Sequence, residues 1–326
     1  MSFDADFIVD RRRMRRKLTF WRVVTVFIAI VAVVGAGLAF SNRGAITGGP
    51  GGGIARVNIE GLIRGNRPRS EALTRLAESN AKAVIVHINS PGGTVAGSEE
   101  LYESLIKVKA KKPMVVVVDG LAASGGYIAA MASDRIVAQQ SAIVGSIGVI
   151  FQYPNVTELL KTIGIQVETV KSSPLKAAPS GYEPTSPEAR AAVEAIVRDS
   201  FDWFKGLVRD RRHLDDASLQ KVADGRVFTG RQAVELKLID GLGDEQAAID
   251  WLAKEKNIDP KTPIRDYPLA PRFSDLPFLH VAALGLLDAV GLNGLAERFR
   301  EFGAVQAVER LNLDGLLALW HPPSSD

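Results

Sequence analysis

The sequence predicts an α/β protein with a mainly parallel sheet and flanking helices, preceded by one N-terminal transmembrane helix. Two observations lead to this prediction. Between residues 54 and 140, short apolar runs alternate with helical patterns and glycine-rich turns, and this order is typical of a parallel sheet. Before them, residues 23–40 form a run without a charged side chain. The 326 residues, of which 46% are hydrophobic, are enough for a sizeable core.

The basic character of the chain belongs to one short flank. Residues 1–22 carry seven Lys and Arg side chains against three Asp, a net charge of +4. The whole chain is +3, so the remainder is −1. This distribution argues against nucleic-acid binding, because the folded part carries no net positive charge.

The run VVTVFIAIVAVVGAGLAF, residues 23–40, has the length of a membrane-spanning helix. At about 1.5 Å per residue it would extend about 27 Å, close to the apolar thickness of a bilayer. The preceding basic cluster predicts a cytoplasmic N-terminus. We therefore expect a single-pass membrane protein whose folded part lies on the far side; in a bacterium this means the inner (cytoplasmic) membrane, with the folded part periplasmic or extracytoplasmic. A cleavable signal peptide ending near Ala39 is the alternative, but its apolar core would be unusually long.

The elements after the glycine-rich linker, residues 41–53, follow from apolar periodicity. IARVNIEGLI (54–63) reads as a strand and SEALTRLAESN (70–80) as a polar helix. AVIVHI (83–88) reads as a buried strand that enters a tight turn at NSPGG (89–93).

The same alternation continues along the chain. We expect a helix over 95–109, a strand over 114–120, a helix over 127–132 and a strand over 134–139. A further helix should begin at Ser186, because a hydroxyl cap precedes proline and glutamate there.

Two glycine-rich turns, SPGG (90–93) and LAASGG (121–126), follow neighbouring predicted strands. In parallel sheets, ligands bind beyond the carboxyl ends of the strands, so both turns should open onto one crevice. Ser124 would then lie near a helix N-terminus, where free N–H groups stabilise negative charge. This placement suits a nucleophile, although small residues there could equally serve close helix–strand packing.

A nucleophilic serine needs a base, and the histidines do not supply an obvious one. His87 lies in an apolar strand and His213 in a charged helix end, while His280 and His321 belong to the tail. A neutral lysine is the other known partner of a catalytic serine. KSSPLKAAPS (171–180) offers both Lys171 and Lys176, and the spacing alone does not separate them.

Five motifs in fixed order resemble the signal peptide peptidase A family, in its short bacterial form. They are NSPGG, LAASGGYIAA, GSIGVI, PLKAAPS and DGRVFTGRQAVELKLIDGLG, and the resemblance spans roughly residues 54–250. It implies a serine–lysine dyad protease with a Clp-protease/crotonase-like fold. It also implies a homo-oligomeric ring in which a site takes its serine and lysine from neighbouring subunits.

The resemblance assigns roles to individual residues. It implies Ser124 as the nucleophile and Lys176, rather than Lys171, as the general base. Ser146 is implied to hydrogen-bond and orient the lysine. The backbone N–H groups of Gly93 and Gly125 are implied as the oxyanion hole.

The function implied is that of a membrane-anchored serine endopeptidase that degrades hydrophobic signal-peptide remnants. Its partners would be cleaved signal peptides, other unfolded hydrophobic peptides and the lipid bilayer, with no nucleic acid. The sequence carries no metal or nucleotide motif, so we expect neither cofactor nor metal. The alternatives are a crotonase-like acyl-CoA enzyme and a catalytically inactive membrane scaffold.

The predicted organisation is a basic cytoplasmic flank (1–22), the anchor (23–40), the linker (41–53) and a peptidase domain (54–255). A C-terminal extension, 256–326, follows. Its apolar run Leu316–Trp320 reads first as a docked helix. The alternatives are an interfacial membrane contact and a segment that occupies the enzyme's own peptide groove.

Overall fold

The computed structural model describes residues 52–269 and 317–319, together with Lys17 and Trp21. The chain divides into two compact units, Met1–Thr47 and Gly48–Asp326. The expected membrane helix over 23–40 lies outside the described residues, as do His280 and His321. Among the helices that are described, none is both long enough and apolar enough to cross a bilayer.

The described strands form one mixed, mainly parallel sheet with the central order β6-β5-β3-β2-β1-β8. β4 and β7 extend it beside β3, and β9 pairs with β2. Only the β5–β6 and β2–β9 pairs are antiparallel. The strands are β1 (Ile54–Ile63), β2 (Ala83–Thr94), β3 (Met114–Ala123), β4 (Arg135–Ala138), β5 (Ile143–Gly145), β6 (Val227–Thr229), β7 (Gly241–Leu242), β8 (Ile264–Asp266) and β9 (Leu317–Leu319).

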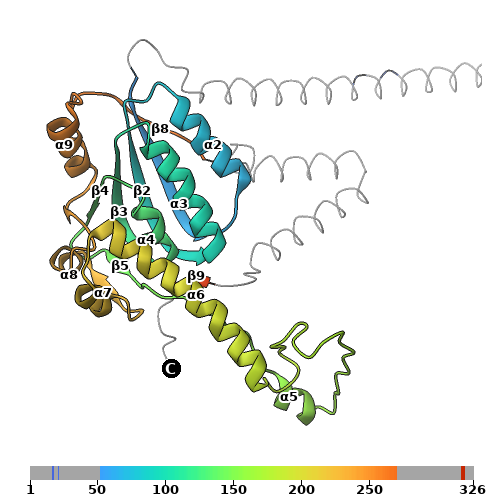
Figure 1. Ribbon diagram of the computed structural model, residues 1–326. Coiled ribbons are helices and arrows are strands. Elements are labelled where there is room, and N and C mark those ends of the chain that lie inside the picture. The colour runs from blue at the N-terminus through green and yellow to red at the C-terminus, as the bar shows by residue number, and fades with distance from the viewer. Residues whose placement is uncertain (1–16, 18–20, 22–51, 270–316, 320–326) are drawn as a thin grey trace, which may run out of the picture. The chain divides into compact units, whose positions relative to one another are not determined.

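Helices cover both faces of this sheet. α2, α3 and α4 pack on one face, and α9 covers the other (Figure 1). Successive side chains of β2 point to opposite faces of the sheet. Val84 and Val86 belong to the larger hydrophobic core, whereas Ile85 belongs to the smaller core that includes Leu252 of α9. The helices are α2 (Arg67–Glu78), α3 (Val95–Lys109), α4 (Gly125–Ala130), α5 (Thr157–Thr162), α6 (Pro187–Arg212), α7 (Asp216–Val222), α8 (Gly230–Glu235) and α9 (Glu245–Lys256).

The predicted α/β class is confirmed, with one local correction. The expected tight turn over residues 89–93 is wrong, because β2 continues through this segment to Thr94. Gly92 and Gly93 pair with β1 on one side and β9 on the other, so these ladders hold both glycines within the sheet. α6 does begin after Ser186, whose side chain accepts a hydrogen bond from the Ala189 N–H at 3.1 Å.

Residues 151–186 and the first turns of α6 form an arm that extends from the sheet, with α5 near its tip (Figure 1). Large apolar side chains stand exposed on it. They include Leu159, Ile163, Val170, Leu175, Tyr182 and Ile196. The arm therefore presents apolar surface that the described part of this chain leaves uncovered.

Candidate active site

Ser124 occupies the junction where β3 ends and α4 begins. Its φ of 54° and ψ of −116° are costly for a residue with a Cβ atom, and such strain is typical of functional positions. The side chain is buried, yet it does not cap α4, and its Oγ has no hydrogen-bond partner among the described residues. The hydroxyl is therefore free for another partner.

Backbone contacts hold this junction in place. The Ser124 N–H donates to the Gly145 carbonyl at 2.7 Å, and the Ser124 carbonyl accepts from the N–H groups of Tyr127 and Ile128. The Tyr127 hydroxyl donates to the Leu238 carbonyl at 2.7 Å, and burial raises the pKa of this phenol. α4 is thus fastened at its first turn to β5 and to the segment after α8.

The last part of β2, residues 90–94, which we call the glycine strand, packs closely around the same junction. A Cβ atom on Gly93 would lie 1.8 Å from the Ile63 carbonyl oxygen, so this position excludes side chains. A Cβ atom on Gly126 would lie 2.6 Å from the Ser90 carbonyl oxygen. Both oxyanion candidates, Gly93 and Gly125, therefore lie on segments that pack tightly against neighbouring backbone.

Ser146 follows β5 and is buried, with a φ of 52°. Its N–H donates to the Arg226 carbonyl at 2.8 Å. Since Ala123 pairs with Gly145 in the β3–β5 ladder, the next residues, Ser124 and Ser146, leave adjacent strand ends. The structure thus places these two predicted site residues at the same edge of the sheet.

β9 lies between the glycine strand and the segment after β5. Leu317–Leu319 pair antiparallel with Gly92–Thr94 of β2, while Ile150 and Leu317 exchange two backbone hydrogen bonds of 3.1 Å. The docked helix expected first for the tail is therefore wrong at residues 317–319. An extended segment has its hydrogen bonds satisfied on both edges here, as a bound peptide would have.

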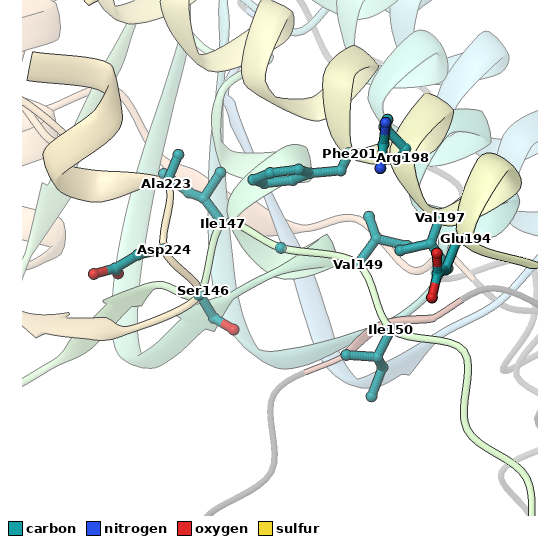
Figure 2. Close-up of a pocket in the computed structure, with 12 residues that line it drawn as sticks. Ser146, Ile147, Val149, Ile150, Glu194, Val197, Arg198, Phe201, Ala223 and Asp224 are labelled. Atoms are coloured by element: carbon teal, nitrogen blue, oxygen red, sulfur yellow. The ribbon is translucent and has the colours of Figure 1, made fainter. Parts of the chain in front are cut away.

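A cavity of about 610 Å³ flanks this position (Figure 2). Ile147 and Val149 of the segment after β5 face Val197 and Phe201 of α6 across it (Figure 2). Charged side chains stand at its rim. They are Glu194, Arg198 and Asp224.

Lys176 lies in the arm and is exposed. Its segment connects α5 to α6 at the end of α6 that points away from the sheet (Figure 1). Because the Ser124 Oγ has no partner among the described residues, this chain does not bring Lys176 into hydrogen-bond contact with it. Lys171 is mostly buried and forms an ion pair with Glu183, which lowers the pKa of that carboxyl.

His87 is a satisfied residue of the sheet, as its apolar strand indicated. Its Nδ1 lies 2.8 Å from Asp119 and its Nε2 lies 2.9 Å from Glu245. Arg56 adds two hydrogen bonds of 2.6 Å to Glu245. His213, the other described histidine, ends α6 in the left-handed conformation and is exposed.

Sequence reasoning did not single out the Arg56–His87–Glu245 network, whose members lie far apart along the chain. It also gave no role to Ser90, whose buried hydroxyl bonds to both β1 and β2. The serine hydroxyl next to the glycines of the SPGG motif was the sequence feature that could have indicated this role. Among the described residues, no group of His, Asp and Glu side chains is arranged to hold a metal ion.

Comparisons with known proteins identify the family to which this chain is similar. The model of peptidase family S49 matches residues 106–259. A Synechocystis sp. protein named as a protease is 37% identical over 64% of this chain and 76% of its own length. An Enterococcus faecium protein named as signal peptide peptidase SppA is 36% identical over 59% of this chain and 56% of its own. Protease 4 of Salmonella typhi is 34% identical over 58% and 31%.

A solved structure of a ClpP1 variant from Listeria monocytogenes aligns over 58% of this chain and 91% of its own, with a TM-score of 0.40 and 16% identity. The relatives found by sequence are more similar to this chain than this structure is. The predicted resemblance to signal peptide peptidase A and the predicted class of enzyme are both confirmed at the level of the family. The chain belongs to peptidase family S49, a family of serine peptidases.

Proposed function

We propose that this chain is an endopeptidase that uses Ser124 and Lys176 to cleave extended apolar peptides. The observation that carries the proposal is the buried, strained Ser124, whose hydroxyl has no hydrogen-bond partner in the described part of the chain, at the sheet edge where β9 is bound as an extended strand. Family membership supports peptide-bond hydrolysis. The assignment of Ser124 and Lys176 as the catalytic pair goes beyond what family membership supports.

The reaction needs only a base and an oxyanion hole. Neutral Lys176 takes the Ser124 proton while Oγ attacks the peptide carbonyl carbon, and the negative oxygen accepts from the N–H groups of Gly93 and Gly125. Each such donor contributes about 10²–10³ in rate. Lys176 then gives its proton to the leaving nitrogen as the C–N bond breaks. A water molecule, deprotonated by Lys176, hydrolyses the acyl ester and regenerates the Ser124 hydroxyl. Ser146 would orient the lysine.

The base comes from a neighbouring subunit in this proposal. Lys176 is exposed on the arm, and the arm carries exposed apolar side chains such as Leu159 and Leu175. An arm that docks on a second copy would bury this surface and deliver the lysine. Such a head-to-tail contact closes into a ring when its rotation permits.

The substrate class follows from the groove and its cavity. A peptide in the place of β9 would pair with Gly92–Thr94 and with Ile150, which requires an extended, unfolded chain. The apolar lining at Ile147, Val149 and Phe201 would accept apolar side chains. We therefore propose signal-peptide remnants as substrates.

The proposal includes the site of action. Residues 23–40 would anchor the enzyme in the bacterial inner membrane, with the peptidase domain on the periplasmic or extracytoplasmic side. The anchor would concentrate the active site near such substrates.

A fluorophosphonate probe tests the nucleophile. The full-length protein should be labelled at Ser124, and Ser124→Ala should be neither labelled nor active. Ser104→Ala is a matched control, because Ser104 is a buried serine in α3 whose hydroxyl only bonds within that helix. Labelling of Ser124→Ala at the wild-type rate would refute the proposal. An unlabelled, inactive wild type would favour the scaffold.

A further inference from the structure

Ser90 lies where the regular pairing of β1 with β2 is interrupted. The register shifts by one residue between Glu60 and Leu62, so Ser90 and Pro91 together oppose Gly61. Such a bulge leaves backbone groups without ladder partners. Pro91 has no N–H to donate, so it cannot restore the ladder.

The Ser90 hydroxyl takes over these missing bonds. It is fully buried, donates to the Gly61 carbonyl at 2.7 Å and accepts from the Gly92 N–H at 3.1 Å. One side chain therefore connects Gly61 of β1, which lies opposite the bulge, to the residue that precedes Gly93. Both groups it satisfies belong to glycines with positive φ, 67° at Gly61 and 99° at Gly92.

Glycine backbones at positive φ have no Cβ atom to restrict rotation, so their orientation depends on hydrogen bonds. Anchoring the Gly92 N–H limits how the following peptide group, which carries the Gly93 N–H, can turn. Precise placement matters for a donor to a developing oxyanion, because its contribution depends on its geometry at the reacting atom.

Ser90 also contacts the other half of the site through its backbone. Its carbonyl oxygen lies 2.6 Å from the position of a Cβ atom on Gly126, two residues after Ser124. Ser90 pairs with Ala122 of β3, two residues before Ser124. The residue that anchors the glycine strand is thus packed against the strand and helix that carry the nucleophile.

We propose that Ser90 is a positioning residue: its hydroxyl sets the orientation of the Gly92–Gly93 segment relative to Ser124. This role rests on the proposed function, since it is the oxyanion donor at Gly93 that Ser90 orients. Ser90 does not touch the reacting atoms and acts through Gly92.

The test compares Ser90→Ala with Ser104→Ala in the full chain. Ser104→Ala deletes a buried hydroxyl that donates to the Glu100 carbonyl at 2.8 Å within α3. We expect Ser90→Ala to lower kcat for peptide hydrolysis at least about tenfold while KM changes less than about threefold, because donor geometry affects the transition state more than binding. Ser104→Ala should keep kcat within about twofold.

Amide hydrogen exchange provides a readout that is independent of catalysis. Residues 89–95 should exchange faster in Ser90→Ala and unchanged in Ser104→Ala, because only the first loses the bond to the Gly92 N–H. Ser90→Cys keeps a weaker donor and acceptor, so its kcat should lie between those of wild type and Ser90→Ala. It also serves as the test variant if Ser90→Ala does not fold.

Wild-type exchange at residues 89–95 in Ser90→Ala would overturn the proposal. So would a kcat loss that Ser104→Ala shares, or one that appears only in KM. An inactive wild type without labelling at Ser124 would instead contradict the proposed function, and the exchange comparison would still decide whether the Ser90 hydroxyl orders the glycine strand.

Discussion

Lys171 and Glu183 form an ion pair within the arm, and this pair distinguishes the two lysines that residue spacing alone left equivalent. The Lys171 side chain is only 16% exposed and is committed to a partner on the same arm. Lys176, five residues later, is exposed and forms no ion pair with any residue that the structure describes. The arm therefore holds one lysine as a structural cation and presents the other.

Replacing each lysine in turn should separate these roles. Lys176→Met is expected to lower kcat/KM by about 10²–10⁴, the usual contribution of a general base. Lys171→Met should cost less than about tenfold, through local loosening of the arm around unpaired Glu183. Peptide hydrolysis by both variants is the measurement. Equal losses would contradict the assignment of Lys176.

Mixed oligomers test whether the dyad is shared between subunits. Ser124→Ala and Lys176→Ala proteins should each be inactive, and co-assembled rings should recover about a quarter of wild-type activity, because random neighbours place two intact halves together in about one site of four. Activity is measured on oligomers verified to contain both chains. No recovery in them would place the dyad within one chain.

The contact between α4 and the glycine strand predicts the effect of a single methyl group. Gly126→Ala would put a Cβ atom 2.6 Å from the Ser90 carbonyl oxygen, so it should lower the free energy of unfolding by about 1–3 kcal/mol and reduce kcat. Gly206→Ala is the matched control, because Gly206 lies in α6 and its added Cβ would meet no atom within 4 Å. There the alanine should stabilise by up to about 1 kcal/mol. Chemical denaturation measures both, and a neutral Gly126→Ala would disprove the close contact.

The Arg56–Glu245 pair predicts a stability change in acid. Hydrogen bonds from the Arg56 guanidinium lower the pKa of the Glu245 carboxyl, and the contact with His87 lowers it further. A folded-state pKa below the unfolded value, about 4.3, stabilises the fold above that pH and loses this contribution as the pH falls through the folded value. Asp266 and Asp119 complete the charges around the pair.

Urea denaturation of Glu245→Gln at several pH values measures this contribution. The difference in unfolding free energy from wild type should be largest near pH 7 and should shrink below about pH 4. Glu71→Gln, which loses only an exposed pair with Arg67, should stay close to wild type throughout. A Glu245→Gln difference that is constant with pH would rule out this linkage.

The paired position of β9 predicts that the tail competes with substrate. Deleting residues 313–326 removes β9 and should raise kcat/KM for a short peptide severalfold, because a tethered strand has an effective concentration of up to about millimolar. Deleting residues 320–326 alone keeps β9 and should leave the rate near wild type. If both truncations behave like the full chain, β9 does not obstruct the groove.

The sequence by itself determined the sheet class and the position of Ser124 at the end of a strand. Apolar runs such as residues 83–86 and 114–118 are buried on both faces of the sheet, and their composition indicates this locally. Parallel strands end at one edge, so the glycine-rich segments at the ends of neighbouring strands had to meet. Ser124 accordingly lies between the end of β3 and the start of α4, and α3 begins two residues after Gly93.

The tertiary structure decided whatever depended on pairing between distant segments. Glycines 92 and 93 read as a turn, since their local preference is for a bend, but ladders to β1 and β9 hold them in a strand. Residues 317–319 likewise form a strand because they pair with β2 on one side and with Ile150 on the other. The partners of Lys171 and Ser90 have the same origin: a hydrogen bond depends on where the chain returns in space, and residue spacing along the sequence does not record that distance.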